Sequence, residues 1–77
     1  MQGFSYNISV SVTNGSYSGP STIETLGVTN VYITPDSGYS FPSSISVTGA
    51  TFIWNNDSGI VALSNPTDNV SITVVCV

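Results

Sequence analysis

Apolar and polar residues alternate along most of this chain, with the two-residue period of strands that are buried on one face only. The first clear segment, residues 6–14, would turn four side chains to one side: Tyr6, Ile8, Val10 and Val12. The last segment, residues 70–77, repeats the pattern with Val70, Ile72, Val74 and Cys76. Apolar residues do not recur at the spacing of an amphipathic helix over a useful length. The pattern therefore predicts an all-β protein.

Turn signals divide the alternation into short strands. We expect strands over residues 6–14, 28–34, 44–49, 50–56, 60–64 and 70–77, and a short edge strand within 21–27. Residues 14–21, NGSYSGPS, are interpreted as a loop, because Asn-Gly and Gly-Pro pairs favour turns. Two hairpins are expected in the C-terminal half. The 77 residues allow one domain, residues 1–77, and six to seven short strands predict an antiparallel β-sandwich.

The same alternation assigns the interior of this sandwich. The expected inward positions of two central strands are aliphatic: Val31, Ile33, Val61 and Leu63. Within residues 50–56, Phe52 and Trp54 share one face and Ile53 lies on the other. This placement favours a core position for the two aromatic rings over a carbohydrate-stacking platform.

The charge pattern limits the partners. The chain has no Lys or Arg and four acidic residues, which gives a formal net charge of −4. Nucleic acids and anionic membranes both attract proteins through Lys and Arg, so the sequence predicts neither nucleic-acid binding nor membrane insertion. No apolar run has the length of a membrane-spanning helix. The start, MQGFSYNISV, lacks the features of a signal peptide, so we expect a protein that either stays in the cytoplasm or leaves as part of something assembled there.

The strand edges raise a question about assembly. Natural edge strands are commonly guarded by lysine, and this chain has none. Either proline, bulges and short strands protect the edges, or neighbouring chains cover them. The second alternative favours assembly with partners or with copies of the same chain.

Side chains that could carry out catalysis are scarce. Histidine and lysine are absent, so serine could pair only with a carboxylate, which is a poor base for a hydroxyl group. The single cysteine, Cys76, cannot form an internal disulfide, and its place in an apolar strand predicts a buried, inert thiol. We therefore predict no catalytic residue, no cofactor and no enzymatic activity.

The aspartates are expected to serve turns. Asp36, Asp57 and Asp68 lie in the segments PDSG, NDSG and PTDN, where Asp bonds the local backbone. Gly38 and Gly59 can supply positive φ in the first two of these turns. None of the three segments has the ligand spacing of a calcium loop, so we predict no metal site.

The stretch TPDSGYSFPSSISV, residues 34–47, is interpreted as a strand end, a turn and a strand start. We expect Tyr39, Phe41 or both to pin this stretch to the end of the core. Tyr17 and Tyr39 fall in expected loops, so they are the candidates for contact with a partner surface.

Residues 31–74 also carry a series of motifs in a fixed order: Pro35–Tyr39, Pro42–Gly49, Thr51–Trp54, Asp57–Gly59 and Asn65–Val74. This order resembles the short Ig-like repeat modules of bacteriophage virion proteins and of some bacterial surface proteins. Residues 4–15, FSYNISVSVTNG, fit the opening strand of such a module by pattern only. The complete absence of lysine departs from the group. The resemblance implies an Ig-like β-sandwich that is not an enzyme.

Members of this group are repeats or appendages on capsid, tail and adhesin proteins, which they decorate or space. The resemblance therefore implies a structural component of a phage virion, either a capsid decoration or head-fibre protein or a tail-associated module. Its partners would be other virion proteins or copies of itself. Two alternatives stay open: an extracellular or cell-surface adhesion module that contacts glycans or a host surface through Tyr17 and Tyr39, and a self-assembling extracellular filament subunit joined by edge strands.

Overall fold

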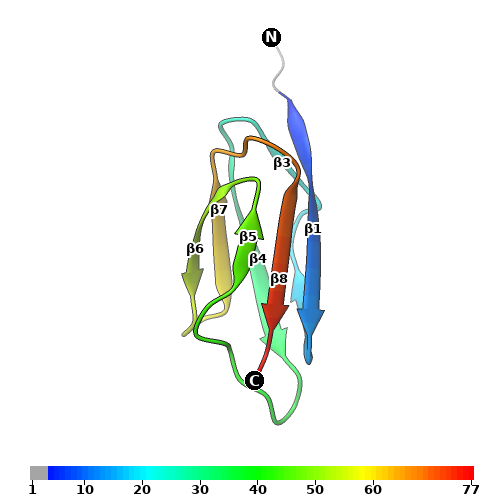
Figure 1. Ribbon diagram of the computed structural model, residues 1–77, viewed down its shortest axis with the longest axis vertical. Helices are drawn as coiled ribbons and strands as arrows, with labels where there is room; N and C mark the ends of the chain where they lie inside the picture. Colours follow the sequence, from blue (N-terminus) through cyan, green and yellow to red (C-terminus); the bar gives the residue numbers. More distant parts are fainter. Residues whose placement is uncertain (1–3) are drawn as a thin grey trace.

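The computed structural model describes residues 4–77, which form eight strands in two sheets (Figure 1). No helix occurs within these residues. The strands are β1 (Ser5–Thr13), β2 (Gly15–Ser18), β3 (Thr22–Glu24), β4 (Val28–Pro35), β5 (Ser46–Thr48), β6 (Thr51–Asn55), β7 (Ile60–Ser64) and β8 (Val70–Val75). The predicted all-β fold is confirmed, with eight strands in place of six to seven.

The two sheets contain four strands each and stack as a sandwich. One sheet has the order β3-β1-β8-β5, and the other has the order β2-β4-β7-β6. β1 and β8 pair in parallel over residues 8–13 and 70–75. The other strand pairs in the described part of the chain are antiparallel, as the sequence predicts.

The strand β2 is absent from the sequence prediction, which assigns a loop to residues 14–21. Asn14 has a φ of 61°, and at this point the chain turns from the first sheet into the second. Gly15–Ser18 then pairs with β4, with Tyr17 opposite Ile33. A Gly- and Ser-rich segment has little strand preference of its own, so its structure depends on the partner strand. The loop prediction for Tyr17 is therefore wrong.

One of the two hairpins expected in the C-terminal half is formed, between β6 and β7. β5 and β6 are consecutive in the chain but belong to different sheets, and so do β7 and β8. The turns at 49–50 and 65–69 therefore carry the chain across the sandwich. Each crossing lets two apolar strand faces bury one another, which a flat hairpin would not do.

The core lies between the sheets and consists of the inward side chains of β1, β3, β4, β7 and β8, together with Cys76 just after β8. Its buried members are Ile8, Ile23, Val31, Ile33, Val61, Leu63, Val70, Ile72, Val74 and Cys76. Phe52 and Trp54 are partly buried against it, whereas Ile53 is 70% exposed on the opposite face of β6. The alternation in the sequence thus placed these side chains correctly.

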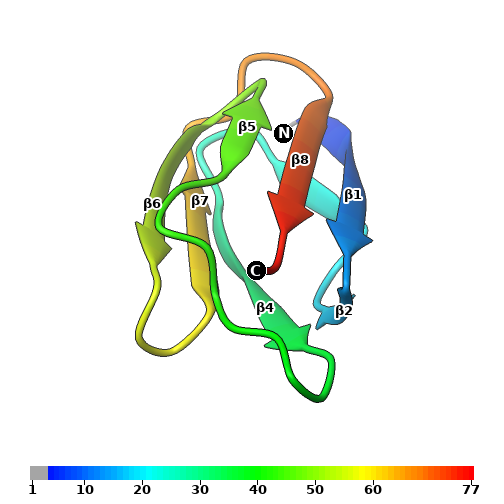
Figure 2. The ribbon, with the colours of Figure 1, turned by 60° about the horizontal axis from the view of Figure 1, so that its bottom comes forward.

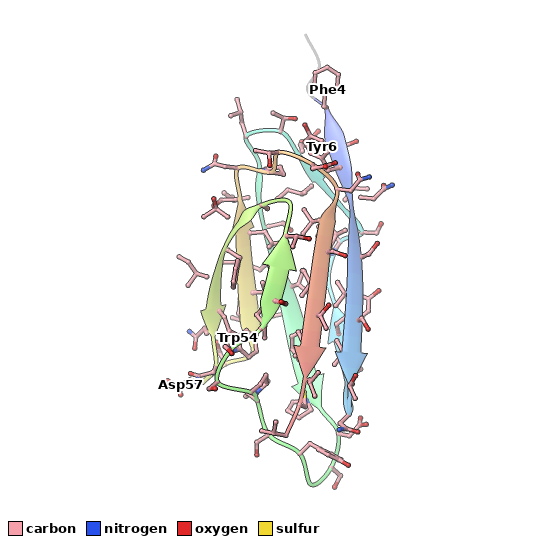
Figure 3. The ribbon with its side chains drawn as sticks, viewed as in Figure 1. Phe4, Tyr6, Trp54 and Asp57 are labelled. Atoms are coloured by element: carbon pink, nitrogen blue, oxygen red, sulfur yellow. The ribbon has the colours of Figure 1, made fainter. Side chains whose placement is uncertain are left out.

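The parallel pairing of β1 with β8 determines at which ends of the sandwich the chain enters and leaves. Because β1 and β8 run in the same direction, the start of β1 and the end of β8 lie at opposite ends of the sandwich (Figure 1). Phe4 and Tyr6 lie at the end away from Trp54 and Asp57 (Figure 3). The molecule measures 47 × 16 × 16 Å, so these ends are the tips of an elongated body.

Candidate functional site

The segment between β4 and β5, residues 36–45, passes from the second sheet to the first around the C-terminal end of the molecule (Figure 2). It begins with a tight turn in which the Tyr39 N–H donates to the Asp36 carbonyl at 2.9 Å. Gly38 is the third residue of this turn and has a φ of 89°, as a type II turn requires. The Asp36 N–H donates to the Asn14 carbonyl at 2.9 Å, which ties the turn to the β1–β2 junction.

The middle of this segment is pinned by an aromatic contact. The Phe41 ring meets the Trp54 ring edge-on, with centroids 5.9 Å apart and an interplanar angle of 74°. The Trp54 Nε1–H donates to the Pro42 carbonyl at 3.0 Å. Ser40 and Val77 exchange two backbone hydrogen bonds. Phe41 therefore provides the expected attachment to the core.

The two tyrosines singled out by the sequence are both partly exposed. Tyr39 is 44% exposed at the turn after β4, and Tyr17 is 49% exposed on the edge strand β2. The Asp36–Asn14 hydrogen bond joins the turn that carries Tyr39 to the residue just before β2. The structure thus places both residues toward the C-terminal end of the body, on adjoining segments.

The aspartates lie in three separate turns, but among residues 4–77 only Asp68 makes the predicted hydrogen bond between its carboxylate and the local backbone. Asp68 Oδ1 accepts a hydrogen bond from its neighbour's N–H, that of Asn69, at 2.7 Å. In the β6–β7 turn the cap is Asn55, whose Oδ1 accepts from the N–H groups of Asp57 and Ser58 at 3.0 and 3.3 Å. Within residues 4–77, no group of three or more potential metal-binding side chains comes together.

The thiol of Cys76 is enclosed by the core. Its residue is 1% exposed, and it lies beside Gly15, where the chain has just entered β2. Burial raises the pKa of the Cys76 thiol above its ordinary value, and the negative charge of Asp36 adds to the effect. The thiolate, which is the reactive form, is therefore disfavoured. The predicted buried, free cysteine is confirmed.

A hollow of about 420 Å³ lies at the opposite end of the body, and no sequence motif predicts it. Its walls come from the start of β1, from β3 and from the start of β4, and include Ser5, Ile23, Glu24 and Thr29. The β3–β4 turn beside it holds Leu26, which is 85% exposed and has a φ of 65°. Most of the lining falls within residues 20–29, and only Ser5 of β1 comes from a segment farther away in the sequence.

The two outer faces of the sandwich differ in chemistry. The face of the β3-β1-β8-β5 sheet is lined largely by hydroxyl groups, among them Ser9, Ser11, Ser46, Thr48, Ser71 and Thr73. The face of the β2-β4-β7-β6 sheet carries apolar side chains between its Ser, Thr and Asn residues: Val28, Tyr32, Ile53, Ile60 and Ala62. None of the strands β2, β4, β6 and β7 contains a charged residue. This sheet therefore offers an uncharged surface for contact.

Comparison with known proteins found no match: no family model, no curated protein and no solved structure matches the chain. The described residues contain no helix long and apolar enough to cross a membrane.

Proposed function

We propose that this protein is a non-enzymatic structural component of a phage virion, either a capsid decoration or head-fibre protein or a tail-associated module. The observation that carries the proposal is the in-line geometry of the sandwich. The chain enters at one tip of a 47 Å body and leaves at the other, because its first and last strands are parallel. This arrangement suits a module that projects from a particle or spaces two neighbouring parts.

The structural roles of the motif residues support the resemblance to short Ig-like modules of phage virion proteins. The Pro35–Tyr39 motif forms the turn after β4, and Pro42 accepts the hydrogen bond of the Trp54 indole. Gly59 in the β6–β7 turn lies against the Phe41 ring and accepts a hydrogen bond from the Ile33 N–H at 2.7 Å. These motifs hold the end of the sandwich together, as shared motifs of a structural module would.

The surface also suits a role in assembly. Its exposed groups are mainly hydroxyl, amide and apolar side chains, which bind through hydrogen bonds and close packing. The partners would be other virion proteins, copies of the chain, or both, in a virion assembled in the host cytoplasm.

The direct test is copurification with particles. Particles from cells that produce the protein are banded in a density gradient and washed in about 1 M salt, which screens weak surface attraction. We expect the protein to stay in a fixed ratio to the major coat protein. Purified protein added to particles that lack it is the control for passive adsorption. Recovery only in the soluble fraction, with the coat protein in the gradient band, would refute the proposal.

A second function, contact with glycans or a host surface, is favoured by the half-exposed rings of Tyr17 and Tyr39. Exposed tyrosines stack well on sugar rings and lose little entropy when they do so. A glycan array should then show binding that Tyr17→Ala or Tyr39→Ala removes. Tyr32→Ala is the matched control, since Tyr32 is 48% exposed on the face of the sheet. Equal binding by all three variants would contradict this function.

A further inference from the structure

The four edges of the sandwich are unequally protected. β3 and β5 have three residues each and β2 has four, so these three edges offer little backbone for pairing. Glu24 lies on β3, and Pro20 lies between β2 and β3, where both guard that side. β6 has five residues, TFIWN, and contains no proline, glycine or charge. It is the longest and least guarded edge strand of the molecule.

β6 is also accessible. It forms the left margin of the molecule in Figures 1 and 2, whereas β5, the edge of the other sheet, lies farther from that margin. Ile53 at its centre is 70% exposed on the outer face. Within residues 4–77, β6 pairs with β7 on one side and with no strand on the other, so the backbone groups of that other side can bind a further strand.

We propose that β6 pairs antiparallel with β6 of a second copy of the chain, about a two-fold axis at Ile53. In this register Ile53 faces Ile53, Phe52 faces Trp54, and Thr51 faces Asn55. The two β2-β4-β7-β6 sheets then join into one continuous sheet across the dimer. Aromatic and β-branched cross-strand pairs of this kind stabilise antiparallel sheets.

The occupant is a second copy because β6 is uncharged and, paired antiparallel with itself, sets apolar residues opposite apolar residues and polar residues opposite polar residues. Each chain carries a net charge of −4 and no Lys or Arg, so contacts that bring carboxylates of two copies together would be repulsive. In the proposed register no carboxylate faces another. The acidic residue nearest to β6 is Asp57, which falls opposite Gly49 of the other copy, just beyond the paired strands.

The proposed interface closes on itself, and it is small. A two-fold contact uses the same patch on both copies, so it yields a dimer and not a growing filament. A pair of five-residue strands falls short of the roughly 800 Å² per partner of a standard stable interface. We therefore infer a weak dimer, formed where copies are held at high local concentration. This inference does not depend on the proposed virion role.

Sedimentation velocity on the purified protein, from about 10 µM to about 1 mM, tests it, because an association free energy of about −4 kcal/mol becomes visible at the upper concentration. We expect reversible dimerisation in the wild type. Ile53→Lys places like charges opposite each other at the two-fold axis and should raise the dissociation constant at least about tenfold. Val28→Lys is the matched control, since Val28 is 79% exposed on the same sheet face but belongs to the inner strand β4. It should leave the dissociation constant unchanged.

Disulfide trapping gives a second readout that tolerates a loss of stability. Directly opposed residues of an antiparallel pair have Cα atoms about 4.5–5.5 Å apart, within the range of a disulfide. Mild oxidation should therefore convert the Ile53→Cys variant to a covalent dimer faster than the Val28→Cys variant. A wild type that stays monomeric at about 1 mM, equal effects of the two lysine variants, or equal trapping of the two cysteine variants would each overturn the proposal.

Discussion

Gly59 and Gly38 provide a matched pair of positions for measuring what holds residues 36–45 against the core. Both have positive φ, 74° at Gly59 and 89° at Gly38. Their surroundings differ. A Cβ atom added at Gly59 would overlap the Phe41 ring and come within 2.6 Å of the Ile33 carbonyl oxygen. A Cβ atom at Gly38 would meet no atom within 4 Å.

The expected losses follow from these surroundings. In Gly38→Ala only the backbone conformation opposes alanine, at about 1–2 kcal/mol, and the stiffer unfolded chain offsets part of this. We expect a net loss of about 1 kcal/mol in the free energy of unfolding. Gly59→Ala adds an overpacking penalty of about 1–3 kcal/mol, because the Phe41 ring or the β4 backbone must move. Its total loss should be about 2–4 kcal/mol.

Urea denaturation of both variants, followed by far-UV circular dichroism and by the fluorescence of the single tryptophan, Trp54, measures these losses. For a domain of this size, about 1 kcal/mol corresponds to a fall in Tm of about 4–8 °C. Trp54 touches Phe41, so its fluorescence should also shift in folded Gly59→Ala and stay unchanged in folded Gly38→Ala.

Equal losses in the two variants would refute the reasoning, since the backbone conformation alone would then explain both. A Gly59→Ala loss larger by more than about 1 kcal/mol, together with the change in Trp54 fluorescence, would show that the contact with Phe41 matters.

Three further predictions concern Leu26 and Cys76. Leu26→Asn should stabilise the fold by up to about 1 kcal/mol, because Asn tolerates positive φ better than Leu; a melting temperature no higher than that of the wild type would contradict this. Cys76 should resist thiol reagents at pH 8 until the protein unfolds, and rapid labelling of the folded protein would contradict its burial. Burial and then Asp36 raise the pKa of the thiol above its ordinary value, so the unfolded state loses its proton first and stability falls as pH rises past that ordinary value. Cys76→Val should show a smaller fall in urea denaturation at pH 10, and an unchanged fall would exclude the thiol as its cause.

Local alternation was sufficient to predict the fold class and the core of this protein. The side chain of a strand residue points to one face or the other with a period of two, so a run such as residues 70–76 fixes its buried side before any partner is known. Val74 and Cys76 are buried for this reason, and Ile53 is exposed between Phe52 and Trp54.

Local sequence did not predict the structure of segments whose conformation depends on a strand far away in the chain. Gly15–Ser18 carries turn residues and becomes a strand only because β4 lies beside it. The turns at 49–50 and 65–69 signal a reversal, but a reversal can close a hairpin or cross between sheets, and the turn residues do not distinguish the two.

For the candidate contact surfaces, too, the sequence predicted some features and only the folded structure decided the others. The sequence alone determined that this is a β protein without basic side chains and without histidine or lysine for catalysis. It also proposed Tyr17 and Tyr39 as contact residues, and Tyr39 or Phe41 as the anchor of residues 34–47. Only the tertiary structure decided that β1 and β8 are parallel, that the chain leaves opposite to where it enters, and that β6 is the unguarded edge. The physical reason is that periodicity is a property of neighbouring residues, whereas pairing partners and edges depend on contacts between residues far apart in the chain.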